Sequence, residues 1–187
     1  MREFTLARQP DTPDELWFVE HPPVYTLGQA GKREHILNSN NIPIVESDRG
    51  GQVTYHGPQQ LVVYTLLDLR RAGLSVRETV IHLENAVIDC LQHFGITAVG
   101  RRDAPGVYVN NAKIAALGLR IRRGRCYHGL ALNVSPDLQP FLGINPCGYE
   151  GLEVTSMEKL EATAPMAQIM DRLLQALLQH IPNATAD

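Results

Sequence analysis

The sequence predicts an α+β fold in a single domain over residues 1–187. Segments rich in β-branched and aromatic residues occur in both halves of the chain, and two other segments carry apolar residues at helical spacing. The composition, 44% apolar and 20% charged, is that of an ordinary globular protein and argues against a disordered chain. No internal repeat or low-complexity tract divides the 187 residues, so strands and helices should share one core.

Four segments before residue 70 are predicted strands: residues 15–20, 24–28, 42–46 and 60–66. His21, Pro22 and Pro23 separate the first two and indicate a short connection. A helix should follow over residues 76–94, because apolar residues repeat there every three or four positions, at Val80, Leu83, Val87, Leu91 and Phe94. Cys90 lies three residues after Val87, so we expect it in the core.

Alternating residues next predict a β-hairpin. Leu117, Leu119 and Ile121 alternate with small or basic residues, and the turn at residues 123–125 leads into a strand over residues 126–134. Cys126 and His128 share the face of Leu130, which predicts a core cysteine and a hydrogen-bonded wall histidine. Several arginines cluster at this hairpin, and we hypothesise that they dock an acidic partner.

The last predicted element is a helix after Pro165, with one apolar face formed by Met166, Ile169, Met170, Leu173, Leu174, Leu177, Leu178 and Ile181. This stripe is typical of core packing. The net charge of −3 and the motifs do not favour nucleic-acid binding. No apolar stretch is long enough to cross a membrane, and three cysteines without paired spacing favour free thiols, so we expect a cytoplasmic protein without metal or cofactor.

The densest polar segment covers residues 49–58, with the sequence RGGQVTYHGP. Adjacent glycines let a ligand approach the backbone closely. The spacing matches neither a P-loop nor a dinucleotide fingerprint, so a binding wall of another kind and a structural turn both stay open.

Cys147 lies in a different context from the other two cysteines. It follows Pro146 and precedes Gly148, and no apolar periodicity includes it. Proline and glycine fix an irregular loop, which would present the thiol rather than bury it.

Together these segments resemble one family, lipoate-protein ligase B, the lipoyl(octanoyl) transferases. The resemblance covers about residues 4–157 and rests on the blocks RGGQVTYHGPQQLVVY (49–64), AKIAALGLRIRRG (112–124) and GINPCGYEGLEVTSM (143–157). It implies the catalytic-domain fold of biotin- and lipoate-protein ligases, a mixed sheet flanked by helices. It also implies transfer of an octanoyl group from acyl carrier protein to a lysine of a lipoyl domain. The implied acceptors are lipoyl domains of 2-oxoacid dehydrogenases and the glycine-cleavage H protein.

The resemblance implies site residues as well. Cys147 would form the acyl thioester and Lys113 would lower the pKa of its thiol, because a neighbouring ammonium favours the thiolate. His56 would act as a general base or as a structural hydrogen-bonding group. The implied substrate-binding residues are Arg49, Gly50, Gly51, Gln52, Val53, Thr54, Tyr55, His56, Ala116, Leu117, Gly118, Gly129, Leu130 and Ala131.

Two departures from the family pattern stand out. The family usually has a strand and part of a helix before the point that matches Phe4, so the resemblance leads us to expect a domain without these elements. Gln59 occupies a position where the family usually has glycine, and if that position requires a positive φ, glutamine should cost about 1 kcal/mol.

Three alternatives remain at this point. Lys113 could be a solvated lysine at the start of a strand. The protein could be an ATP-dependent lipoate or biotin ligase of the same fold, which needs no thiol nucleophile. It could also be a non-catalytic module that binds an acyl group or its carrier.

Overall fold

The computed structural model describes residues 1–148 and 151–182, and at Cys147 it describes the backbone but not the side chain. A large sheet of six antiparallel strands has the order β1-β5-β9-β8-β7-β6. Its strands are β1 (Glu15–Val19), β5 (Gln60–Leu66), β6 (Val99–Gly100), β7 (Gly106–Val109), β8 (Ala112–Arg122) and β9 (Arg125–Asn133).

A small sheet of three strands has the order β3-β2-β4. Its members are β2 (Val24–Leu27), β3 (Ile44–Glu46) and β4 (Val53–His56). β2 pairs parallel with β3 and antiparallel with β4, so the strand pairing of the molecule is mixed.

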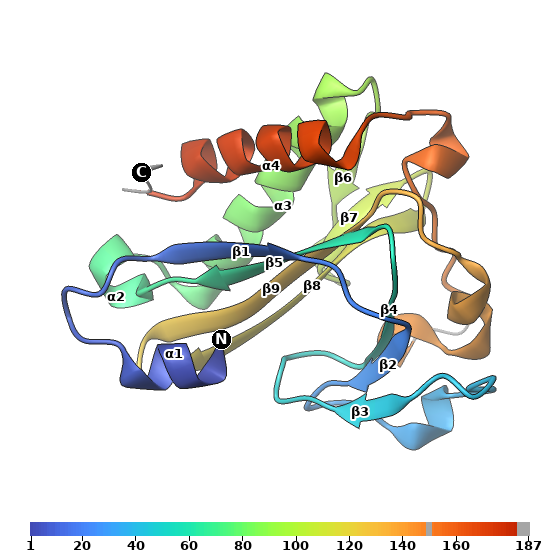
Figure 1. The fold of residues 1–187 in the computed structure, drawn as a ribbon, viewed down its shortest axis with the longest axis horizontal. Helices are drawn as coiled ribbons and strands as arrows, with labels where there is room; N and C mark the ends of the chain where they lie inside the picture. Colours follow the sequence, from blue (N-terminus) through green and yellow to red (C-terminus); the bar gives the residue numbers. More distant parts are fainter. Residues whose placement is uncertain (149–150, 183–187) are drawn as a thin grey trace.

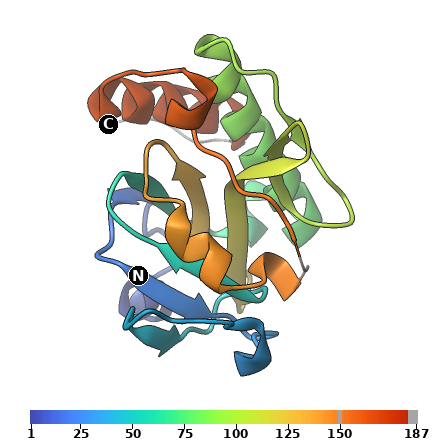
Figure 2. The ribbon, with the colours of Figure 1, turned by 90° about the vertical axis from the view of Figure 1, so that its right-hand side faces the viewer.

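The helices are α1 (Arg2–Ala7), α2 (Leu69–Ala72), α3 (Val76–His93) and α4 (Met166–His180), with short 3₁₀ turns η1 (Arg33–His35), η2 (Gln139–Gly143), η3 (Pro146–Gly148) and η4 (Glu158–Leu160). α3 and α4 pack together on one side of the large sheet, and the small sheet lies on the other side (Figures 1 and 2). This arrangement confirms the predicted α+β class with helices flanking mixed β-structure. No helix in the described parts of the chain pairs the length with the apolar composition of a membrane span.

The main core lies between the large sheet and its two helices. α3 begins with a capping box at Ser75 and Glu78, and its buried face includes Leu83, Val87 and Leu91, as the periodicity predicts. Ile169, Leu173 and Leu177 of α4 are fully buried against the same cluster. A second, smaller cluster around Tyr25, Tyr55 and Phe141 supports the small sheet.

Several elements differ from the expectations. β4 lies inside the polar segment 49–58, where no strand was predicted, and α1, β6 and β7 were also missed. β8 begins at Ala112, so Lys113 is the second residue of the strand. The predicted turn is correct: Arg123 and Gly124 both have positive φ and join β8 to β9 as a two-residue hairpin loop.

Candidate active site

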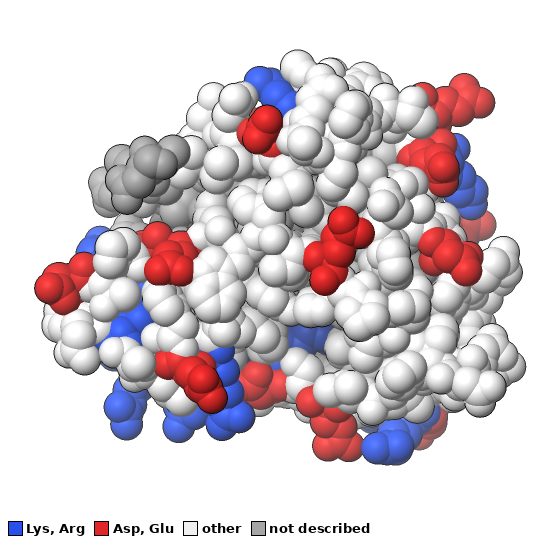
Figure 3. All heavy atoms as spheres, in the orientation of Figure 1, with Lys and Arg blue, Asp and Glu red and all other residues white. Residues whose placement is uncertain are grey.

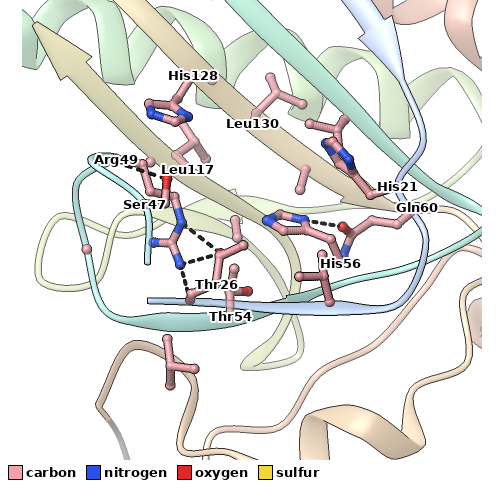
Figure 4. Close-up of a pocket in the computed structure, with 18 of the residues that line it drawn as sticks. His21, Thr26, Ser47, Arg49, Thr54, His56, Gln60, Leu117, His128 and Leu130 are labelled. Atoms are coloured by element: carbon pink, nitrogen blue, oxygen red, sulfur yellow. Dashed lines mark hydrogen bonds between the residues drawn. The ribbon is translucent and has the colours of Figure 1, made fainter. Parts of the chain in front are cut away.

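A cavity of about 380 Å³ lies between the two sheets, a size typical of small-molecule sites. Its walls come from β2, β4, β5, β8 and β9 (Figure 4). Pro146 of η3 also lines it. Val62, Ala116 and Ala131 give it an apolar surface on the side of the large sheet. The polar groups around it come chiefly from histidines, Arg49, Gln60 and Lys113.

Most of the predicted binding residues meet at this cavity. Those that line it are Arg49, Gly51, Gln52, Val53, Thr54, His56, Ala116, Leu117, Gly118, Gly129, Leu130 and Ala131. Leu117 and Leu130 also pack against the helix-covered core.

Two predicted binding residues are absent from the cavity wall. The Tyr55 side chain belongs to the small core under the second sheet and is 3% exposed, because alternation along β4 turns it away from its neighbours Thr54 and His56. Gly50 instead donates its N–H to the Leu119 carbonyl at 2.9 Å, which fastens the glycine-rich turn to β8.

Close backbone packing explains the glycines of the hairpin. A Cβ atom at Gly129 would lie 1.9 Å from the Val63 carbonyl oxygen, and one at Gly118 would lie 3.1 Å from the Gly50 carbonyl oxygen. Both positions therefore serve strand and loop packing, and the space beside them stays open because their neighbours Ala116 and Ala131 are small.

Arg49 shapes the same wall. Its guanidinium donates to the Thr26 carbonyl at 2.7 Å and to the Thr26 hydroxyl, joining the glycine-rich turn to β2. The Arg49 side chain thus holds the glycine-rich turn in place against β2.

Lys113 lines the cavity from β8 and is only 4% exposed, so the alternative of a solvated lysine is wrong. Its ammonium donates to the Pro105 carbonyl at 3.3 Å and lies 5.2 Å from the centre of the Tyr108 ring. Its backbone is also held: the N–H donates to the Glu153 carbonyl and the carbonyl accepts from Thr155.

Cys147 lies in η3, which packs against β4. Its side chain lies outside the described part of the chain, and so does the distance from its thiol to Lys113. The preceding residue, Pro146, lines the cavity together with Lys113 and His56. Asn145 donates its N–H to the His35 carbonyl at 2.8 Å, which anchors the start of the turn.

Cys90 and Cys126 are buried in the main core, as predicted. Burial raises the pKa of each thiol to about 12, so both remain protonated at neutral pH.

His56 ends β4 and is half-buried at the cavity wall. Its Nδ1 lies 2.6 Å from the Oε1 atom of Gln60. Burial lowers the pKa of His56 to about 4 against the opposing effect of the Gln60 hydrogen bond, and the Arg49 charge lowers it further. The ring is therefore neutral at physiological pH.

His128 departs from the predicted alternation. It has a φ of 63° within β9, and this left-handed residue directs the ring to the cavity wall instead of the core face shared by Cys126 and Leu130. The ring stacks on Tyr127, and its Nε2 lies 2.8 Å from Asp48. Its predicted role as a hydrogen-bonded wall residue is confirmed, although by a different backbone path. Burial lowers the pKa of His128.

Other cavity residues carried little signal in the sequence. His21 bonds the Tyr64 hydroxyl at 2.6 Å, and burial lowers the pKa of His21. Gln60 and Asn133 both line the cavity while buried. A polar residue at the end of an apolar strand was the only available indication for either of these two.

Gln59 has a φ of 63°. The position therefore does require the left-handed region, and the expected cost of about 1 kcal/mol for a non-glycine residue applies. Its N–H donates to Glu20 at 2.6 Å and its carbonyl accepts from Ser135, which helps to hold the turn.

Comparisons with known proteins bear on the family and the fold of the chain. The family model described as the lipoyl protein ligase A/B catalytic domain matches residues 1–178. Proteins named octanoyltransferase are similar over most of the chain. The one from Aromatoleum aromaticum is 59% identical, covering 97% of this chain and 79% of its own, and the one from Pseudomonas entomophila is 56% identical, covering 98% and 86%.

Solved structures share the fold at low sequence identity. The bi-partite lipoate protein ligase of Thermoplasma acidophilum superposes with a TM-score of 0.77 at 16% identity, covering 96% of this chain and 75% of its own. A biotin protein ligase from Aquifex aeolicus gives 0.54 at 13% identity, covering 66% and 53%. Both the fold and the family implied by the sequence blocks are thus confirmed, and the chain belongs to the lipoyl protein ligase A/B catalytic domain family.

Proposed function

We propose that this chain is an octanoyltransferase of lipoate biosynthesis, which moves an octanoyl group from acyl carrier protein to a lysine of a lipoyl domain through a thioester on Cys147. The observation that carries the proposal is the 55–62% identity to proteins named octanoyltransferase. The low identity to ATP-bound lipoate-protein ligase A, 16%, makes the ligase alternative weaker.

The first chemical step is acylation of the enzyme. The Cys147 thiolate attacks the carbonyl carbon of the donor thioester, a new C–S bond forms, and the C–S bond to the carrier breaks. The carrier leaves as a thiolate and takes up a proton from solvent. Lys113 would support this step if its buried ammonium reaches the thiol, because a neighbouring positive charge favours the thiolate.

The second step passes the acyl group to the acceptor. The lysine amine attacks the acyl-Cys147 carbonyl, an amide bond forms, and the Cys147 thiolate leaves. The amine must lose a proton during attack, and His56 is a neutral imidazole at the cavity wall that can take it.

The cavity supports an acyl substrate. Its apolar side chains include Val24, Val45, Val53, Val62, Phe141 and Val154. Burial of an alkyl chain on such a surface contributes roughly 0.8 kcal/mol per methylene, which favours a substrate that carries an alkyl chain.

The proposed acceptors are the lipoyl domains of 2-oxoacid dehydrogenases and the glycine-cleavage H protein. The Thermoplasma relative is described together with its E2 lipoyl domain, which supports an acceptor of this kind. Buried free thiols at Cys90 and Cys126 suit a reducing compartment, and we place the protein in the cytoplasm as one catalytic domain.

The hairpin end is the proposed docking surface for the acidic donor. Figure 3 shows basic side chains gathered along one edge of the molecule, where Figure 1 places α1 and the β8–β9 turn. Arg125 donates to the Arg8 carbonyl and lies near Asp68, so it supports the fold, whereas Arg122 and Arg123 are exposed. Reversing these two charges should weaken donor binding at low salt, and unchanged affinity would refute the docking surface.

Mass spectrometry tests the function. Wild-type protein mixed with octanoyl acyl carrier protein and no ATP should gain one octanoyl group on Cys147, and adding a lipoyl domain should discharge it. Cys147→Ser should not accumulate the thioester. An absolute requirement for ATP would identify a ligase, and a protein that binds donor but stays unmodified would be a non-catalytic module.

A further inference from the structure

A chain of three side-chain hydrogen bonds connects the His56 ring to the backbone carbonyl of the buried residue Thr155. Asn133 donates from Nδ2 to the Thr155 carbonyl at 3.0 Å. Gln60 donates from Nε2 to the Asn133 Oδ1 at 2.9 Å. The His56 Nδ1 then lies 2.6 Å from the Gln60 Oε1.

The Thr155 carbonyl fixes the direction of every bond in this chain. A carbonyl only accepts, so the Asn133 amide must present its NH₂ group to Thr155 and its oxygen to Gln60. Gln60 must then present its own NH₂ group, which also donates to the Tyr55 carbonyl at 3.3 Å. Its oxygen is left facing His56, so the Nδ1 of His56 must be the donor.

Burial prevents the opposite orientation. Gln60 is 2% exposed and Asn133 is 4% exposed. If Gln60 flipped, its oxygen would face the Asn133 oxygen and the Tyr55 carbonyl, leaving buried acceptors without donors at a cost of about 1–3 kcal/mol each.

We infer that Gln60 and Asn133 are positioning residues that hold neutral His56 as the Nδ1–H tautomer, with the unprotonated Nε2 directed into the cavity. Figure 4 shows the second ring nitrogen of His56 turned away from Gln60, toward the open space of the site. The ring is neutral and carries a single proton, so the tautomer decides which nitrogen can accept another.

This inference deepens the proposed function and rests on it for its catalytic meaning. In the second step, the acceptor amine loses its proton to the Nε2 of His56. The imidazolium formed keeps its Nδ1–H bond to the Gln60 oxygen, which stabilises the new charge. Thr155 also donates its N–H to the Lys113 carbonyl at 2.9 Å, so one residue anchors both the lysine and the chain that orients the histidine.

The tautomer can be measured directly in the wild-type protein. Long-range ¹H–¹⁵N NMR on the full chain with labelled histidine distinguishes protonated from unprotonated ring nitrogens. We expect a protonated Nδ1 and an unprotonated Nε2 at His56 at pH 7, and the reverse pattern would overturn the inference. No substrate is needed, so a protein with the expected tautomer that never forms acyl-enzyme would refute the proposed function and leave the tautomer standing.

The Gln60→Leu variant tests the positioning role. It removes the acceptor for Nδ1–H, so His56 should populate the Nε2–H tautomer, and acyl transfer from preformed acyl-enzyme to the lipoyl domain should slow by roughly 10²-fold. Formation of acyl-enzyme should change less than threefold. Asp89→Asn is the matched control, because Asp89 bonds His180 at 2.6 Å away from the cavity.

A folded Gln60→Leu protein with an unchanged His56 tautomer, or one in which both steps slow equally, would overturn the inference. If the variant does not fold, the wild-type spectrum still decides the tautomer.

Discussion

The two faces of the large sheet place the same types of residue in different environments. On the face covered by α3 and α4, apolar periodicity is satisfied, and Cys90 and Cys126 are buried thiols with a pKa of about 12. On the cavity face, polar side chains interrupt the strands, and His128 has a left-handed backbone within β9. The helix-covered face stabilises the fold through apolar packing. The cavity face contains a strained backbone and buried polar groups, which hold the side chains of the candidate site in place.

The largest difference between the faces should appear in thiol reactivity. Iodoacetamide should alkylate Cys147 in the native protein at least about 10³-fold faster than Cys90 or Cys126, because a thiol with a pKa of about 12 is ionised to roughly 10⁻⁵ at pH 7. Peptide mass spectrometry over a time course measures the three rates. In urea the three alkylation rates should converge. Comparable rates in the native protein would contradict the predicted difference in thiol reactivity.

Lys113→Met should remove the cation but keep most of the buried side chain. Acyl-enzyme formation should fall by up to about 30-fold at pH 7, because a thiol that returns to its ordinary pKa of about 8.5 is only about 3% ionised there. The deficit should shrink as the pH rises toward 9, where the thiolate forms without help. Single-turnover rates across pH measure this, with exposed Lys159→Met as the control. A deficit that stays constant with pH would rule out a role in thiol ionisation.

The cavity face should also be the acid-sensitive face. His56 has a pKa of about 4 when folded and about 6.5 when unfolded, so the unfolded chain binds more protons between these values. Stability should therefore fall as the pH drops from 6.5 to 4, by on the order of 1 kcal/mol for this partly buried ring.

His56→Asn should remove that part of the loss, as measured by urea denaturation midpoints at pH 7 and 4.5. His180→Asn is the control outside the cavity. An identical pH dependence in wild type and His56→Asn would contradict the assignment.

The smallest expected effect concerns backbone strain. Gln59→Gly should raise the free energy of unfolding by about 0.5 kcal/mol, because glycine adopts the φ of 63° without the penalty of a side chain. Glu161→Gly, at a φ of 60° away from the cavity, is the matched variant. Chemical denaturation measures both, and a loss of stability at Gln59 would mean that the hydrogen bond from the Ser135 hydroxyl to the Gln59 side chain outweighs the strain.

The helix-covered face was largely predictable from the sequence. The stripes of α3 and α4, the buried Cys90 and the β8–β9 turn follow from local periodicity and turn chemistry, and the structure agrees. Those rules work where one face of an element is apolar and the backbone is regular.

For the cavity face, the sequence predicted which residues belong to the site but not how the backbone arranges them. Strand β4 was missed because its residues lie in a glycine-rich polar segment. The positive φ of His128 was missed because an alternating pattern cannot reveal a left-handed residue inside a strand. The Gln60–Asn133 hydrogen bond joins residues far apart in the chain, so no local pattern could reveal it.

The packing at Gly129 limits how the site could change. Any side chain there would collide with the Val63 carbonyl, so only glycine fits at position 129 with the present spacing of the strands. Ala116 and Ala131 face each other across β8 and β9 and line the cavity without such a constraint. Directed evolution toward other acyl lengths should therefore collect its mutations at these two alanines and leave the glycine untouched.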